Sequence, residues 1–145
     1  MYKILLATDG SEYSLEALKK VVPLARAMEA RVTVLTIVEE MPFVKGTEGL
    51  SKEELDTLYR SISTEAEEGL QRAAKLFEAD SVDVETSLET GKPADTICRV
   101  AEEGAYDLVV LGDTGRGGLQ ELLLGSVSNK VAHCANTDVM IVKRR

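Results

Sequence analysis

Five short apolar runs alternate with four helix-like segments along this chain. The runs are residues 3–7, 31–38, 81–88, 107–112 and 138–143. Between them, apolar residues recur every three or four positions, as they do on one face of a helix. Strict alternation of this kind predicts a parallel sheet with helices on both of its faces. We therefore expect a doubly wound α/β fold that forms one domain over residues 1–145.

Residues with capping preferences mark the ends of the helices. A capping box begins at Ser51, and Pro93 stands where proline is tolerated in the first turn of a helix. Gly104 is placed to end that helix, and Ser126 is expected to act as the N-cap of the last one. Pro23 lies inside the first helical pattern, so we expect a kink there or an early end.

Composition excludes several classes of partner. The formal net charge is −8, and an acidic chain does not attract the phosphate backbone of nucleic acids. The sequence has no tryptophan and few aromatic residues on which bases could stack. No apolar run approaches the ~20 residues of a membrane span, and the start does not have the pattern of a signal peptide. We therefore expect a cytoplasmic protein that binds neither nucleic acid nor membrane.

The sequence contains two cysteines, Cys98 and Cys134. Neither has a second cysteine close in sequence, so the spacing matches no CxxC or metal-binding motif. We expect both to be reduced, with Cys134 as a small core residue rather than a redox centre. His133 lies near the end of the last helix, where positive charge suits the helix dipole, and no catalytic role is expected for it.

Glycines gather between the fourth apolar run and the last helix. Gly112 and Gly115 come at the end of the run, and Gly125 and Ser126 precede the helix. Glycine lets a ligand approach the main chain closely, and a helix N-terminus presents unpaired N–H groups. Together these features predict a phosphate cradle. The spacing matches neither GxxxxGK[ST] nor GxGxxG, so a nucleotide would be held differently from either class.

Asp9 follows the first strand and is expected to lie opposite this cradle, because ligands of doubly wound sheets bind beyond the carboxyl ends of the strands. Its carboxylate can accept hydrogen bonds from ribose hydroxyls or bind Mg²⁺ through a water. The alternative is a cap on the first helix, a role for which Ser11 competes. Within the loop, Asp113 either repels phosphate or is a solvated turn residue, the interpretation we favour. Arg116 could offset it by pairing with phosphate.

The pattern Gly112-x2-Gly115-x9-Gly125-Ser126 resembles the nucleotide loop of the universal stress protein family, in its ATP-binding branch. The stretches YKILLATDGSEYSLEAL and GKPADTICRVAEEGAYDLVVLG are also similar to that family, and only residues 39–80 match it less clearly. The resemblance implies a Rossmann-like sheet of five parallel strands in the order 3-2-1-4-5. It further implies a homodimer paired through strand 138–143, and ATP bound across strands 1 and 4 with Mg²⁺ or Mn²⁺; AMP is a possible replacement for ATP.

The resemblance also implies a set of nucleotide-binding residues. Asp9 would contact the ribose or the metal, directly or through a water, and Ile37 would meet the adenine through its backbone. Thr114 stands where the family often has histidine, which weakens one phosphate donor. The whole implied set is Ala7, Thr8, Asp9, Ile37, Leu111, Gly112, Thr114, Gly115, Gly125, Ser126, Val127 and Ser128.

These features favour a small ATP-binding stress-response or signalling module that acts through nucleotide-dependent conformation or through an unidentified protein partner. A slow ATP hydrolase or phosphotransferase is the alternative, but such catalysis needs positioned charge, and the loop has no lysine or histidine. A dimeric scaffold with an empty or AMP-occupied site is a third interpretation. The stretch 39–50 is longer than most connections, which favours a lid or a partner contact.

Overall fold

The structure of the protein is a computed structural model that describes residues 1–10, 12–40, 46–112 and 125–143. Strands and helices alternate along these residues. The strands are β1 (Lys3–Ala7), β2 (Arg31–Val38), β3 (Asp83–Thr90), β4 (Leu108–Gly112) and β5 (Asp138–Val142). The helices are α1 (Glu12–Ala27), α2 (Lys52–Glu78), α3 (Pro93–Glu103) and α4 (Ser126–Cys134). The predicted alternation is confirmed.

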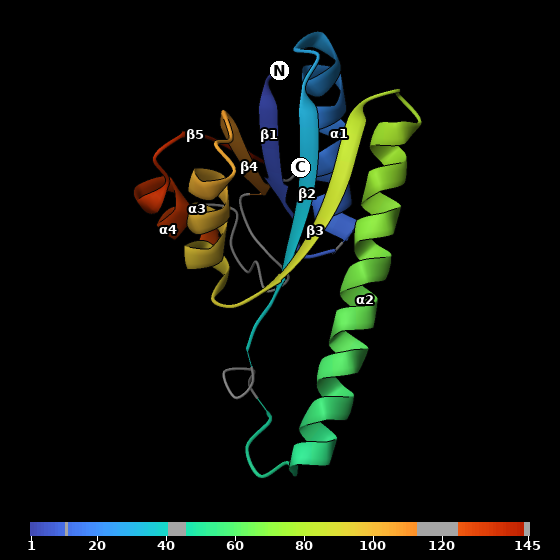
Figure 1. The fold of residues 1–145 in the computed structure, drawn as a ribbon, viewed down its shortest axis with the longest axis vertical. Helices are drawn as coiled ribbons and strands as arrows, with labels where there is room; N and C mark the ends of the chain where they lie inside the picture. Colours follow the sequence, from blue (N-terminus) through green and yellow to red (C-terminus); the bar gives the residue numbers. More distant parts are fainter. Residues whose placement is uncertain (11, 41–45, 113–124, 144–145) are drawn as a thin grey trace.

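All five strands form one parallel sheet in the order β3-β2-β1-β4-β5 (Figure 1). In β1, Leu5 lies opposite Thr33 of β2 on one side and Val109 of β4 on the other. The chain builds the sheet outwards from β1 to β3 and then crosses to β4 on the other side of β1. The strand order therefore reverses between β1 and β4, where doubly wound folds bind their ligands.

The sheet separates two apolar cores. Alternate side chains of a strand point to opposite faces, so Ile4 and Leu6 pack on one side and Leu5 on the other. Helices α1 and α2 cover the first side, where the Phe77 side chain is fully buried. Helices α3 and α4 cover the second side with residues that include Ile97. Two covered faces explain the continuous apolar runs of the central strands.

The boundaries of β3 and α1 differ most from those predicted by sequence, whereas β4 and β5 are each one residue shorter than predicted. β3 covers residues 83–90 rather than 81–88, because the residues after α2 form a capping turn. In that turn, Ser81 has a φ of 59° and the N–H of Val82 donates to the carbonyl of Phe77 at 3.0 Å. In α1, the expected early end at Pro23 does not occur, and the N–H of Met28 donates to Leu24 at 3.0 Å.

The long helix α2 begins with the predicted capping box. The N–H of Glu54 donates to Ser51 Oγ at 3.1 Å, and the N–H of Ser51 donates to Glu54 Oε2 at 2.9 Å. Figure 1 shows that the first half of α2 extends beyond the sheet, while its second half packs beside β3. No helix in the part of the chain that the structure describes has the length and apolar character needed to cross a membrane.

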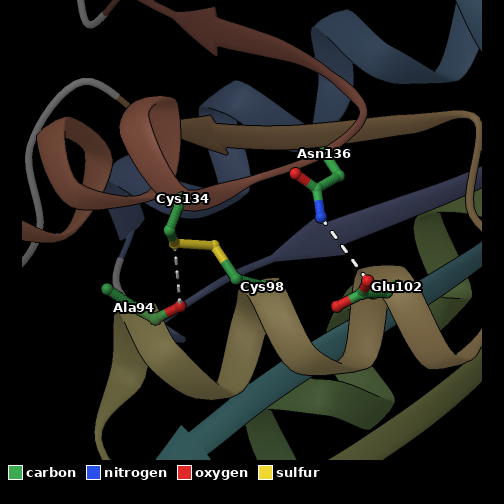
Figure 2. The surroundings of a disulfide bond; sticks show 5 residues. All are labelled: Ala94, Cys98, Glu102, Cys134 and Asn136. Carbon is green, nitrogen blue, oxygen red and sulfur yellow. Dashed lines mark hydrogen bonds between the residues drawn. A yellow bond between two sulfur atoms is a disulfide. The ribbon is translucent and has the colours of Figure 1, made fainter.

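The expectation of two separate, reduced cysteines is wrong. Cys98 and Cys134 are joined by a disulfide, with their Cα atoms 6.2 Å apart (Figure 2). The residues lie 36 positions apart in sequence, but α3 and α4 pack side by side on one face of the sheet. The Cys134 residue is exposed, so its prediction as a core residue is also wrong. Sequence spacing missed the pair because tertiary packing alone brings it together.

Gly104 ends α3, as predicted, and packs closely against a tyrosine. Its φ is −83°, so backbone freedom is not what requires glycine here. A Cβ added to Gly104 would collide with the Tyr106 ring, lying only 2.8 Å from Cδ2 and closer still to Cε2. The ring is held in place because the Tyr106 hydroxyl donates to Thr33 Oγ1 at 2.8 Å and Lys3 Nζ lies 4.6 Å from its centroid.

We expect Gly104→Ala to lower the free energy of unfolding by about 1–3 kcal/mol, because a fixed ring must move. Ala105→Gly is the matched control, since Ala105 has a φ of 50° that glycine adopts without strain. That variant should keep the stability or raise it by at most about 1 kcal/mol. Urea denaturation measures both. Equal stability of Gly104→Ala and the unmodified protein would show that the ring moves freely.

Candidate functional site

The candidate site lies at the carboxyl ends of β1 and β4. The two strands are paired neighbours, with Leu6 opposite Val110. Thr8 and Asp9 follow β1, and Gly112 is the last residue of β4. The described residues at the tips of the first and fourth strands therefore meet at one end of the sheet.

A network of hydrogen bonds fixes the turn after β1. The N–H of Thr8 donates to the carbonyl of Leu35 at 2.9 Å, and Thr36 Oγ1 donates to the carbonyl of Thr8 at 3.0 Å. The N–H of Gly10 donates to Thr8 Oγ1 at 3.1 Å, and Gly10 has a φ of 77°, which glycine adopts without strain. Thr36 was missed by sequence analysis, because its hydroxyl acts on a neighbouring strand.

The Asp9 carboxylate is oriented by the helix that follows it. Ser14 Oγ, in the first part of α1, donates to Asp9 Oδ1 at 2.6 Å. This hydrogen bond fixes the position of the carboxylate relative to the start of α1. Ser14 was not predicted from sequence, although a serine five residues after a strand-end aspartate is the signal that could have indicated it.

The N-terminus of α4 reaches the same edge of the sheet. Gly125 is its N-cap, so the prediction of Ser126 as N-cap is wrong by one position: Ser126 is the first helical residue, and it is exposed. Glycine has no side chain with which to cap the first-turn N–H groups. These donors and the positive end of the helix dipole are suited to an anion.

Ser128 joins α4 to the end of β4. Its side chain is buried, and its Oγ donates to the carbonyl of Gly112 at 2.6 Å. The hydroxyl is therefore engaged in positioning the helix against the strand, whereas the family resemblance implies that Ser128 lies beside the phosphates. Val127, the residue before it, packs partly buried against the core under α3 and α4.

The remaining predicted residues divide into two groups. Ala7, Ile37 and Leu111 lie at the carboxyl ends of β1, β2 and β4, and all three pack against the core on the α3 and α4 face. Thr114 and Gly115 lie outside the described residues, as do Asp113 and Arg116. The structure thus brings together Thr8, Asp9, Gly112 and the start of α4.

Among the described residues, a metal ion would find few protein ligands at this edge. Within the described ranges, no three His, Cys, Asp or Glu side chains come together as a metal site. Asp9 is the predicted metal residue, and one carboxylate suits an ion that takes most of its ligands from phosphate and water. The donor set therefore fits a metal that arrives with a nucleotide rather than one held by the protein alone.

Comparison with known proteins identifies the family. The model of the universal stress protein family matches residues 1–143. The universal stress protein MJ0531 of Methanocaldococcus jannaschii is 36% identical over 143 residues, which cover 98% of this chain and 82% of that protein.

Two solved structures share the fold over almost their whole length. The structure of MJ0577 from the same organism has a TM-score of 0.86 at 29% identity, covering 99% of this chain and 96% of that chain. A universal stress protein solved in complex with cAMP has a TM-score of 0.75 at 26% identity, covering 99% and 98%. The chain therefore belongs to the universal stress protein family.

Proposed function

We propose that this protein is an ATP-binding module that acts through nucleotide-dependent conformation or partner binding in a stress or signalling response. The first turn of α4, which begins at the N-cap Gly125 beside the end of β4, carries the proposal. It offers backbone donors to an anion at the position where the strand order reverses. The cAMP complex of a relative with the same fold supports an adenine nucleotide as the ligand.

In this proposal different residues bind different parts of the nucleotide. Asp9 takes the ribose or a Mg²⁺ or Mn²⁺ ion, and the backbone of Ile37 meets the adenine. The N–H groups of Ser126 and Val127, with the glycine loop that contains Gly115, take the phosphates. A divalent ion bound with ATP would neutralise part of the phosphate charge, which matters in a chain with a net charge of −8.

Binding without rapid turnover is the favoured mode of action. Phosphoryl transfer needs a positioned nucleophile and cationic groups at the transferring phosphate. At the described part of this edge, Asp9 is held by Ser14, and the donors of α4 are backbone N–H groups. Such a site supports affinity more than catalysis, so hydrolysis, if measured, should be slow.

The proposal includes a homodimer formed through β5, in the cytoplasm. Both β3 and β5 are edge strands, but β3 carries Asp83, Glu85 and Glu89, while β5 carries one charge followed by Val-Met-Ile-Val. Charged residues protect an edge from pairing, and an apolar edge is open to it. Two copies related by a twofold axis would pair their β5 strands antiparallel.

Isothermal titration of ATP with Mg²⁺ into nucleotide-stripped protein tests the site. We expect micromolar binding, and about 100-fold weaker binding by Gly115→Val, which corresponds to about 2.7 kcal/mol. Parallel titrations with AMP and cAMP rank the ligands, and phosphate release measures turnover. Absence of binding by the unmodified protein would leave the dimeric scaffold as its function, and rapid phosphate release would make it an enzyme.

A charge-matched pair of variants separates a local effect from a loss of net charge. Asp9→Asn should weaken binding of ATP with Mg²⁺. Asp83→Asn removes the same charge from an exposed ion pair with Arg31 at the opposite edge of the sheet, and should leave binding unchanged. Equal effects of the two substitutions would count against a contact between Asp9 and the ligand.

A further inference from the structure

The disulfide lies at the far end of the helix whose first turn faces the candidate site. Cys134 is the last residue of α4, and Cys98 lies in the middle of α3 (Figure 2). The site described above needs neither residue for contact with a ligand. The pair nevertheless fixes the position of α4, and α4 supplies the backbone donors.

Besides the disulfide, helix α4 is held in position mainly by contacts of its first two turns. It is nine residues long, a length at which a helix is not stable by itself in water. Ser128 holds its first turn to β4, and the buried side chain of Val131 holds its middle. Ala132 and His133 are exposed, so the disulfide joins the last turn to α3, and just beyond the helix Asn136 Nδ2 donates to Glu102 Oε1 of α3 at 3.5 Å (Figure 2). Beyond the helix, Thr137 Oγ1 donates to the carbonyls of Tyr106 and Asp107 at 3.0 Å.

The two sulfurs differ in their access to a reagent in solution. The Cys134 residue is exposed, whereas Cys98 is half-buried and packs against the core beneath α3. A thiolate from solution therefore reaches Cys134 Sγ first. Attack at Cys134 Sγ makes Cys98 the leaving thiolate.

We propose that the Cys98–Cys134 disulfide is a redox-modification site, at which a dithiol reductant opens the bond and lowers the affinity of the nucleotide site. The affinity part of this inference rests on the proposed function. Disulfides of proteins in a reducing compartment are usually transient and catalytic or redox-sensing, which agrees with the cytoplasmic location in that proposal.

The reaction is a thiol–disulfide exchange. One thiolate of the reductant bonds to Cys134 Sγ, the bond to Cys98 breaks, and Cys98 leaves as a thiolate that takes up a proton. The second thiolate of the reductant then attacks the reductant sulfur that is bonded to Cys134 Sγ. This step closes the reductant's own disulfide and releases Cys134 as a thiolate, which also takes up a proton. The protein gains two electrons and two protons, and the reductant becomes a disulfide.

Opening the bond should loosen α4 without unfolding the domain. Cys134 Sγ lies 3.9 Å from the carbonyl oxygen of Ala94, so the thiol of the reduced form, itself a weak donor, has an acceptor nearby (Figure 2). The backbone donors of the first turn would then be less well ordered before a ligand binds, and ordering them costs affinity. We expect an increase of about tenfold in the Kd for ATP, within the usual range of coupling between two sites.

The test compares oxidised and reduced protein. Alkylation with N-ethylmaleimide should label neither cysteine in aerobically purified protein and both after treatment with dithiothreitol. Titration with ATP and Mg²⁺ should give a tenfold higher Kd after reduction. The double variant Cys98→Ala with Cys134→Ser is the control: it should bind like the reduced protein and should not respond to dithiothreitol. Free thiols in the aerobic protein, or one Kd for both states, would overturn the inference.

Two further measurements do not depend on nucleotide binding. Hydrogen exchange should show lower protection of residues 126–134 after reduction, with the strands unchanged. Glutathione should form its mixed disulfide on Cys134 rather than Cys98, as mapped by peptide mass spectrometry. If neither state binds a nucleotide, the proposed function fails. Unchanged exchange in α4, or glutathione on Cys98, would overturn the redox mechanism itself.

Discussion

Loss of the Cys98–Cys134 disulfide should lower the free energy of unfolding by about 3–4 kcal/mol. The bond closes a loop with a sequence separation of 36, and a cross-link of that size removes conformational entropy from the unfolded chain. In a domain of 145 residues, this change corresponds to a decrease in Tm of roughly 10 °C. Differential scanning calorimetry of the unmodified protein, with and without dithiothreitol, measures the effect.

The variant Cys98→Ala with Cys134→Ser separates the cross-link from the chemistry of the reductant. Its Tm should equal that of the reduced protein and should not change when dithiothreitol is added. Alanine is chosen at position 98 because that residue packs against the core, and serine at 134 because that residue is exposed. If the oxidised protein has the same Tm as the variant, the disulfide destabilises the native state by as much as it destabilises the unfolded chain.

The sequence predicts the order of elements because local patterns determine them. β1 and β2 occupy the predicted residues, since each apolar run is bounded by polar or turn-forming residues. The start of β3 was predicted two residues early, because Ser81 and Val82 close the capping turn of α2. Apolar periodicity does not distinguish such a turn from the first residues of a strand. The strand order came from family resemblance, and the structure confirms it.

Residues of the candidate site that lie at the ends of strands could be predicted from the sequence. Hydrogen bonds between different elements could not. Asp9 and Gly112 lie at strand ends, and the fold brings those ends together. The hydrogen bonds of Thr36 and Ser128 cross between elements, so no local pattern contains them. The disulfide is the extreme case, because the spacing of its cysteines matches no motif and its formation follows from the packing of α3 on α4.

A negative charge at the centre of β5 should dissociate the proposed homodimer. Met140 is the middle residue of β5 and is 36% exposed in the single chain. If two β5 strands pair antiparallel over their full length, the twofold axis brings Met140 near Met140 of the partner. Met140→Glu would then remove apolar contact and place two like charges together, which costs several kcal/mol in all.

We expect the dimer Kd of Met140→Glu to rise by about 100- to 1,000-fold, because each factor of ten corresponds to 1.4 kcal/mol. Sedimentation velocity over a range of concentrations measures this change. Met28→Glu is the matched control: Met28 is 37% exposed after the end of α1, and the substitution makes the same change in side chain and net charge. A dimer unaffected by Met140→Glu would move the interface away from β5. If both variants dissociate the dimer, the cause is the change in net charge rather than a contact at the β5 edge.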